Sequence, residues 1–203
     1  MDSLQAQETF DPADWYSRNA VTYCAAWADQ PTPELDVFCA KLRHGARIAD
    51  VACASGRDLR AGTRNNMKMF GSDIAQGQID IARNRGYNAN VMSFLDLDYD
   101  TDSFDAVWAF AAVVHCTPEQ TRTALREFSR IVRPGGLVFV NVKAVDSTVG
   151  PEGFDTQGRW FHLWDRATFN ALVTETIGSL EQTAHSVEEL RRVEWLSCTA
   201  RVA

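Results

Sequence analysis

The sequence predicts a single α/β domain in which a mostly parallel sheet is covered by helices on both faces. Its 203 residues suit one domain with a sizeable core. Between about residues 46 and 143, short apolar runs alternate with helical stretches through short connections. This rhythm is typical of strand–helix units in a parallel sheet.

The elements can be assigned in order along the chain. A helical region over 12–43 is expected in two pieces, because Pro31 and Pro33 interrupt it. The five strands of the parallel part are expected at 46–52, 67–73, 87–93, 104–110 and 137–143. The helices between them are expected at 57–65, 75–85 and 118–132, and a turn is expected at 133–136.

After residue 143 the rhythm changes. Residues 146–159 contain Gly, Pro and Asp and are expected to form a loop, followed by a helix over about 165–176. The two strands expected at 179–187 and 192–202 are joined by a connection too short for a parallel crossover. We therefore expect an antiparallel hairpin at the edge of the sheet.

Composition excludes several classes of protein. The net charge of -7 argues against a general nucleic-acid binder. There is no long apolar run for a membrane span and no apolar leader at the start, so we expect a cytoplasmic protein. The five scattered cysteines form no paired motif, and we expect neither a disulfide framework nor a metal site.

The end of the first expected strand is the first candidate site, because ligands of open parallel sheets bind at the carboxyl ends of the strands. Asp50 stands in this strand, and small residues follow it at Ala52, Ala54 and Gly56. Small side chains let a ligand approach the backbone, and the next helix offers free N–H groups there.

The second expected strand ends at Asp73. An acidic residue at this point can accept both hydroxyls of a ribose. The alternative is an N-cap for the following helix. The small-residue turn upstream favours the ribose role.

Taken together, the segments RIADVACASGRDL, MFGSDI, VMSFLDLDYDTDSFDAVWAFAAVVH and LREFSRIVRPGGLVFVNVK closely resemble the class I S-adenosylmethionine-dependent methyltransferases. The resemblance covers roughly residues 46–143 and implies a Rossmann-like, seven-stranded, mostly parallel sheet. The rest of one domain, 1–203, would then be a helical lid over 1–45 and a lid loop, helix and β-hairpin over 144–203.

The resemblance also implies roles for individual residues. The turn would wrap the methionine part of S-adenosylmethionine, Asp73 would hold the ribose, and Ile74 would lie beside the adenine. S-adenosylhomocysteine would be the product. The cofactor-contacting set implied in this way is Tyr23, Asp50, Ala52, Cys53, Ala54, Gly56, Asp73, Ile74, Gln78, Met92, Ser93, Phe94, Ala109 and Phe110.

Two departures from related patterns matter. The family's first strand normally ends in Gly-x-Gly-x-Gly, whereas here Ala52 and Ala54 replace the first two glycines. Alanine disfavours a positive φ, so the cofactor is expected to sit slightly shifted or bind more weakly. Arg57 stands where a dinucleotide-binding turn needs its third glycine, which argues against a dehydrogenase.

The acceptor site is expected beneath aromatic residues of the lid. Trp15, Trp160 and His162 are assigned to the acceptor, and Tyr16 is expected to orient it. His115 is the first candidate base and His162 the second, although His115 has an equally good structural role. Three tryptophans are expected in the core: Trp27, Trp164 and Trp195.

Three functions remain open. The first is methyl transfer to O, N or C of a small-molecule metabolite or natural product, without nucleic acid or membrane. The second is a tRNA nucleoside methyltransferase, which predicts a basic surface from Arg57, Arg60, Arg64, Lys68 and Arg159. The third is a cofactor-binding or partner subunit without turnover of its own, prompted by the missing glycines.

Overall fold

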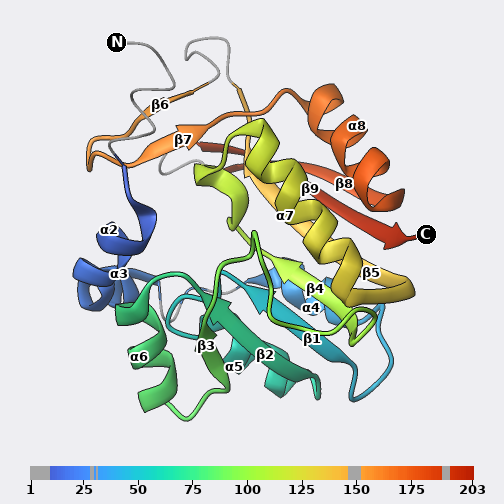
Figure 1. Cartoon of the computed structure of the whole chain (residues 1–203), viewed down its shortest axis with the longest axis horizontal. Coiled ribbons are helices and arrows are strands. Elements are labelled where there is room, and N and C mark those ends of the chain that lie inside the picture. Colours follow the sequence, from blue (N-terminus) through green and yellow to red (C-terminus); the bar gives the residue numbers. More distant parts are fainter. Residues whose placement is uncertain (1–9, 28–29, 31, 146–151, 189–192) are drawn as a thin grey trace.

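The computed structural model describes residues 10–27, 30, 32–145, 152–188 and 193–203 (Figure 1). Three predictions fall on residues outside this part: the helix break at Pro31, the first part of the loop at 146–151, and the start of the last strand at residue 192. In chain order the elements are α2 (Pro12–Arg18), α3 (Ala20–Trp27), α4 (Pro33–Cys39), β1 (Arg47–Val51), α5 (Arg57–Arg64), β2 (Lys68–Asp73), α6 (Gln76–Asn84), β3 (Ala89–Val91), β4 (Phe104–Ala109), η1 (Val113–His115), α7 (Pro118–Ile131), β5 (Val132–Lys143), β6 (Glu152–Phe154), β7 (Trp160–His162), α8 (Arg166–Thr176), β8 (Gly178–Glu188) and β9 (Val193–Val202). No helix in the described ranges is long and apolar enough to cross a membrane.

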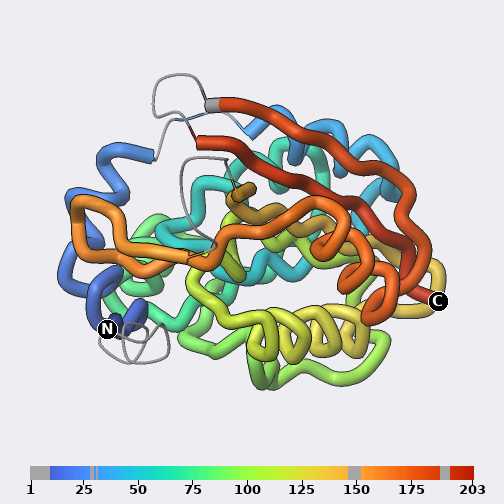
Figure 2. The backbone as a smooth tube through the Cα atoms, turned by 90° about the horizontal axis from the view of Figure 1, so that it is seen from above, coloured from blue at the N-terminus to red at the C-terminus, as the bar shows by residue number. Residues whose placement is uncertain are grey.

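Within the described residues, seven strands form one sheet in the order β3-β2-β1-β4-β5-β9-β8 (Figures 1 and 2). The pairs from β3 to β5 are parallel, whereas β9 runs antiparallel to both β5 and β8. The predicted mostly parallel sheet with an antiparallel C-terminal hairpin is therefore confirmed. β9 lies inside the sheet, so β8 rather than β9 forms the edge.

Several element boundaries differ from the prediction. In the described part of the predicted helical region 12–43 there are three helices rather than two, because Asn19 caps α2 and its side-chain amide donates to the Trp15 carbonyl at 2.8 Å. β5 begins at Val132 and absorbs the predicted turn, because Val132 already pairs with Phe104 ahead of a register shift. The second half of the predicted loop 146–159 contains β6, which pairs with β7 in a small separate hairpin.

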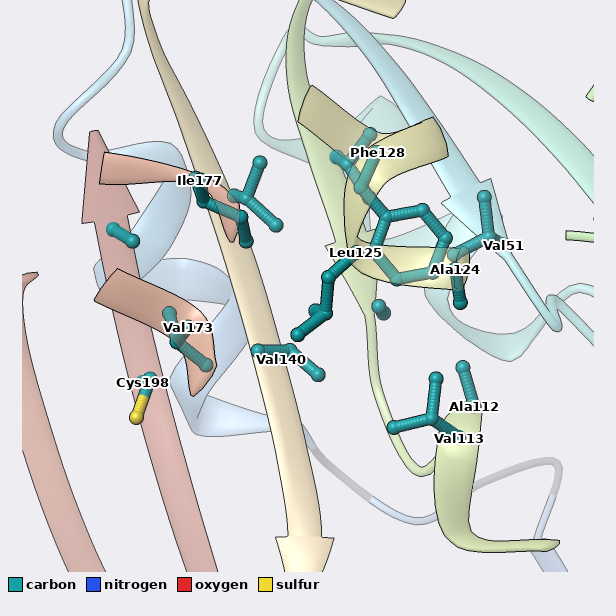
Figure 3. Packing of buried hydrophobic residues seen from close by; sticks show 14 of the residues in the cluster. Val51, Ala112, Val113, Ala124, Leu125, Phe128, Val140, Val173, Ile177 and Cys198 are labelled. Atoms are coloured by element: carbon teal, nitrogen blue, oxygen red, sulfur yellow. The ribbon is translucent and has the colours of Figure 1, made fainter. Parts of the chain in front are cut away.

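Alternating side chains of the sheet pack against different helices. On β1, Ala49 and Val51 belong to the cluster shared with α7 and α8, shown in Figure 3, while Ile48 belongs to the cluster shared with α4. Strand residues one apart point to opposite faces, so both faces of the strand are apolar and buried. Helices therefore cover both faces of the sheet, and a ligand can reach it only at the ends of its strands.

The segment that carries η1 is fixed at its far end by the start of α7. Thr117 caps this helix in a reciprocal capping box with Gln120, and Pro118 occupies the first turn. β4 ends just before η1. The short stretch between them is thereby held at the carboxyl edge of the sheet.

Candidate active site

A pocket of about 1720 Å³ lies at the carboxyl ends of the parallel strands. Its floor comes from the residues that follow β1, β2 and β4, and its roof comes from α2, α3 and the β6–β7 hairpin. Sites for one drug-sized ligand usually measure about 300–1,000 Å³. The space therefore suffices for two ligands side by side.

The loop after β1 has an unusual backbone. Ala52, Ala54 and Gly56 have φ values of 67°, 47° and 89°. All three lie in the left-handed region, which costs an alanine about 1–2 kcal/mol. At Gly56 a Cβ would also meet the Tyr87 ring at 2.5 Å. Both the positive φ and the nearby ring therefore require glycine at this position. The predicted conformational conflict at both alanines is thus present in the fold.

Asp73 ties this loop to the end of β2. One carboxylate oxygen accepts the Ala54 N–H at 2.9 Å, and the other accepts the Ala75 N–H at 2.9 Å. Burial raises the pKa of Asp73, while the N–H donors oppose that rise. Ala75, not Asp73, occupies the N-cap position of α6. The carboxylate nevertheless lines the pocket and has lone pairs left for a ligand.

A second buried carboxylate, Asp58, organises the wall near β4. It accepts hydrogen bonds from the Thr32 hydroxyl at 2.8 Å and the Trp108 indole at 2.9 Å, and it forms a two-point ion pair with Arg57. The Arg57 guanidinium lines the pocket and lies 5.1 Å from the centre of the Phe110 ring. Our sequence reasoning missed this cluster. The sequence did offer one sign of it: the indole N–H of Trp108, in an apolar strand, needs a buried hydrogen-bond acceptor.

Asp50 lies behind the loop rather than in the pocket wall. It is buried, and its Oδ2 has no hydrogen-bond partner among the described residues. Burial raises the pKa of Asp50 well above its usual value, and the charge of Asp58 adds to the effect. A protonated Asp50 would avoid an unpaired buried charge.

His115 occupies the other end of the pocket, and both of its ring nitrogens are engaged. Nδ1 bonds to the Trp160 carbonyl, which can only accept, so Nδ1 carries the proton. Nε2 therefore accepts from the Tyr16 hydroxyl, at 2.9 Å. Burial lowers the pKa of His115 to about 4. The imidazole is thus neutral near neutral pH.

Helix α2 lies beside the β6–β7 hairpin, as the two views in Figures 1 and 2 show. The Trp15 indole donates to the Gln157 carbonyl at 3.3 Å, and Arg159 donates to the Tyr16 hydroxyl at 3.3 Å. Arg159 is also paired with Asp155 at 2.7 Å. These contacts close a roof over the pocket.

Most of the predicted site residues come together around this pocket. Those that line it are Trp15, Tyr16, Tyr23, Ala52, Cys53, Ala54, Asp73, Ile74, Gln78, Ser93, Phe94, Phe110 and His115. Those that do not are Asp50, Gly56, Met92, Ala109, Trp160 and His162. Ala109 is fully buried in the sheet, and Met92 packs against the core.

The placement of Trp160 and His162 in the pocket was wrong. Successive side chains of a strand point to opposite faces, and in β7 it is Phe161 that lines the pocket. Trp160 and His162 share the other face, with ring centres 6.3 Å apart, and Trp160 is 2% exposed. Among the predicted core tryptophans, Trp164 is buried, whereas Trp27 and Trp195 line the pocket.

Two residues of β5 also belong to the site and were missed. Asn141 accepts the N–H of Ala111, which has a φ of 53°, at 2.5 Å and so fixes the turn after β4. Lys143 lines the pocket at the end of the same strand, with its amine 3.2 Å from the centre of the Phe161 ring. An asparagine inside the apolar run LVFVNVK was the available signal.

Comparison with known proteins gives the same assignment as the fold. A family model described as a methyltransferase domain matches residues 48–136. The tRNA (carboxymethyluridine(34)-5-O)-methyltransferase alkbh8 of Xenopus tropicalis is 33% identical over 117 residues, which is 57% of this chain and 18% of that protein. The 27-O-demethylrifamycin SV methyltransferase of Amycolatopsis mediterranei is 33% identical over 104 residues, 47% of this chain and 38% of that protein.

A solved structure is similar over most of the chain. The 1,6-didemethyltoxoflavin-N1-methyltransferase of Burkholderia thailandensis, with 1,6-didemethyltoxoflavin and S-adenosylhomocysteine bound, has a TM-score of 0.76 and 17% identity. The match covers 94% of this chain and 87% of that one. The family model, the curated relatives and the sheet order agree on one assignment for the matched core: residues 48–136 belong to the class I S-adenosylmethionine-dependent methyltransferases.

Proposed function

We propose that the chain methylates a small molecule held between the cofactor-binding loop and the aromatic roof. One observation carries this proposal: α2 and the β6–β7 hairpin meet above a pocket with room for two ligands. A bound acceptor would lie beneath the contacts that join α2 to the β6–β7 hairpin. A roof over the site suits a metabolite or natural product better than a macromolecule.

The residues at one end of the pocket fit S-adenosylmethionine. The left-handed loop from Ala52 to Gly56 exposes backbone to a ligand, and Asp73 presents a carboxylate where a ribose would lie. Ile74 is 42% exposed beside it and offers an apolar surface for the adenine. Ser93 and Phe94 line the same wall.

When bound, S-adenosylmethionine supplies a methyl group activated by the sulfonium. This chain's residues then have to align the acceptor and exclude water, and alignment alone can contribute about 7–11 kcal/mol. Trp15, Tyr16 and Tyr23 form the water-excluding roof, and their faces suit a cationic centre. Of the two roles open for His115, we assign it the structural one, because its hydrogen bond orients the Tyr16 hydroxyl.

A tRNA nucleoside is the second candidate acceptor, favoured by the 33% identity to the Xenopus tropicalis tRNA enzyme. The placement of the five basic residues predicted for this role argues against it, because Arg60, Arg64 and Lys68 lie outside the pocket lining. Arg57 is paired with Asp58, and Arg159 is paired with Asp155. A phosphate-binding face needs cations directed at solvent.

The test offers the protein both kinds of acceptor together with methyl-labelled S-adenosylmethionine. We expect label in the low-molecular-weight fraction of a cell extract and none in an unmodified tRNA pool. Label in the tRNA, falling steeply with added salt, would replace this proposal with the second candidate. Calorimetry with S-adenosylhomocysteine beforehand verifies that the cofactor site is intact.

A further inference from the structure

A row of aromatic rings stands on one face of the sheet. Trp108 of β4 and Phe110, which follows β4, are two residues apart, so their side chains share this face. The Phe139 ring of β5 has its centre 4.1 Å from that of Trp108 and 6.4 Å from that of Phe110, with interplanar angles of 20° and 5°. Trp195 of β9 continues the row, 6.3 Å from Phe110 at an angle of 27°. Four rings from three strands therefore lie nearly parallel to one another.

The two ends of this row are covered differently. Trp108 and Phe139 are buried, and Phe38 of α4 packs on that end with its ring centre 5.4 Å from that of Trp108. Phe110 and Trp195 are only half-buried, and both line the pocket. Large apolar faces left open in a pocket are typical of contacts with a ligand. One wall of the pocket is thus the open end of an aromatic stack.

This wall begins next to the loop after β1. Asp50 of β1 pairs in parallel register with Trp108 of β4, so the two strands reach the carboxyl edge of the sheet at the same level. The Arg57 guanidinium, at the end of the loop, lies 5.1 Å from the centre of the Phe110 ring. A molecule that lies against Phe110 is therefore a neighbour of the loop for which we propose S-adenosylmethionine.

Uncharged polar groups accompany the open rings. Asn141 of β5 lies opposite Ser197 of β9 in the register, and both residues line the pocket. Their side chains are on the same face as the rings, because Phe139 and Trp195 stand two residues before them on the two strands. An amide and a hydroxyl both donate and accept hydrogen bonds. They can orient the polar substituents of a ring that lies on this wall.

We infer that the methyl acceptor is a planar aromatic or heteroaromatic molecule that extends this row of rings and lies with its face against Phe110 and Trp195, an inference that rests on the proposed function. Aromatic rings gain from offset stacking on one another beyond what burial of their area supplies, and a saturated ring does not make this contact. Phe110 and Trp195 hold and orient the acceptor and take no part in making or breaking bonds.

The test compares two ligands that share a carbon skeleton and one hydroxyl: 2-naphthol, which is flat, and decahydro-2-naphthol, which is not. Each is titrated by calorimetry into the protein saturated with S-adenosylhomocysteine. We expect the parent protein to bind 2-naphthol about three- to tenfold more tightly, which is the ratio that a stacking contact supplies. Trp195→Leu and Phe110→Leu each keep an apolar side chain and remove a flat ring. Each should bring the ratio of the two affinities close to one.

Phe70→Leu is the matched control. The Phe70 ring is half-buried like that of Phe110, but it lies outside the pocket lining and packs against the Arg47 guanidinium, 4.3 Å from the ring centre. This variant should keep the preference of the parent for 2-naphthol. An unchanged affinity of the Trp195 variant for S-adenosylhomocysteine shows that it is folded.

Four results distinguish failure of the inference from failure of the proposed function. A parent protein that binds both ligands equally well would overturn the inference, and so would a preference for 2-naphthol that survives in both variants. Transfer of methyl label to a small acceptor without an aromatic ring would overturn it too, while leaving the proposed function in place. A preference that both variants lose, together with label found only in tRNA, would overturn the proposed function and keep the two rings as a stacking surface.

Discussion

Asp73 performs two tasks with one carboxylate. Each oxygen accepts a backbone N–H, one from the loop after β1 and one from the start of α6, and the group also lines the pocket. It therefore holds the loop after β1 against the start of α6. We propose that its remaining lone pairs take the ribose hydroxyls.

Asp73→Ala should weaken binding of S-adenosylhomocysteine by about 10–100-fold, because hydrogen bonds to a charged group contribute about 1.5–3 kcal/mol. Calorimetric titration measures the change. Asp80→Ala is the matched control, since Asp80 lies on α6 and is bonded to Gln76 at the surface. An Asp73 variant that binds as tightly as the control would disprove the ribose role.

Ala52 and Ala54 have positive φ values, so replacing either of them by glycine should not destabilise the protein in the way that loss of Asp73 weakens binding. Ala52→Gly or Ala54→Gly removes a strained Cβ and should leave stability unchanged or raise it by up to about 1 kcal/mol. Ala61→Gly, inside α5, should cost about 1 kcal/mol for the ordinary helical reason. Thermal unfolding compares the three variants. Equal losses at all three positions would contradict the strain.

His115 predicts a pH dependence of stability. Its pKa is lowered by burial from 6.5 to about 4 in the folded protein, so the unfolded chain binds the proton first as the pH falls. The free energy of unfolding should therefore decrease between about pH 6.5 and 4, by about 3 kcal/mol in total. His115→Gln should remove this part of the profile. A variant whose profile parallels that of the parent would show that His115 does not titrate in this way.

At the scale of elements, the roof is formed by α2 and the β6–β7 hairpin, which are far apart in the sequence. A few side-chain contacts join them, chiefly from Trp15, Tyr16 and Arg159. Neither element belongs to the central sheet. Such elements open more readily than buried strands do.

Binding of S-adenosylhomocysteine should therefore slow amide hydrogen exchange in α2, α3 and the β6–β7 hairpin. The β8–β9 hairpin, most of which lies away from the pocket, should change little and serves as the internal reference. Mass spectrometry of exchanged peptides measures both. Protection that is equal everywhere would mean global stabilisation instead of closure of the roof.

The sequence could predict the elements but not the facing of every strand. The loop after β1, Asp73 and the expected aromatic lid were identified from local residue types and spacing. β7 was missed as a strand because Trp160, Phe161 and His162 are all bulky rings, which leaves no apolar–polar alternation to read. Without a known start for β7, sequence alone could not show that Phe161 would enter the pocket.

At the scale of the whole molecule, the sequence allowed the strand directions to be inferred, but not which of the last two strands lies next to β5. The short connection between the last two strands required them to be antiparallel. Which of them pairs with β5 depends on long-range packing, and β9 takes that place. The hydrogen bonds of Asp58 with Thr32 and Trp108, and the contacts of Phe161 with His115, likewise arise only when distant segments meet.

The position of β9 has a consequence for how the protein is made on the ribosome. β8 is synthesised before β9 but has no partner in the sheet until β9 fills the gap beside β5. A nascent chain that has just released β8 therefore carries one unpaired edge on β5 and a β8 strand with no partner on either side. Such edges are sites of association between chains. Until β9 is inserted, the open edge of β5 is therefore exposed to pairing with a strand of another chain.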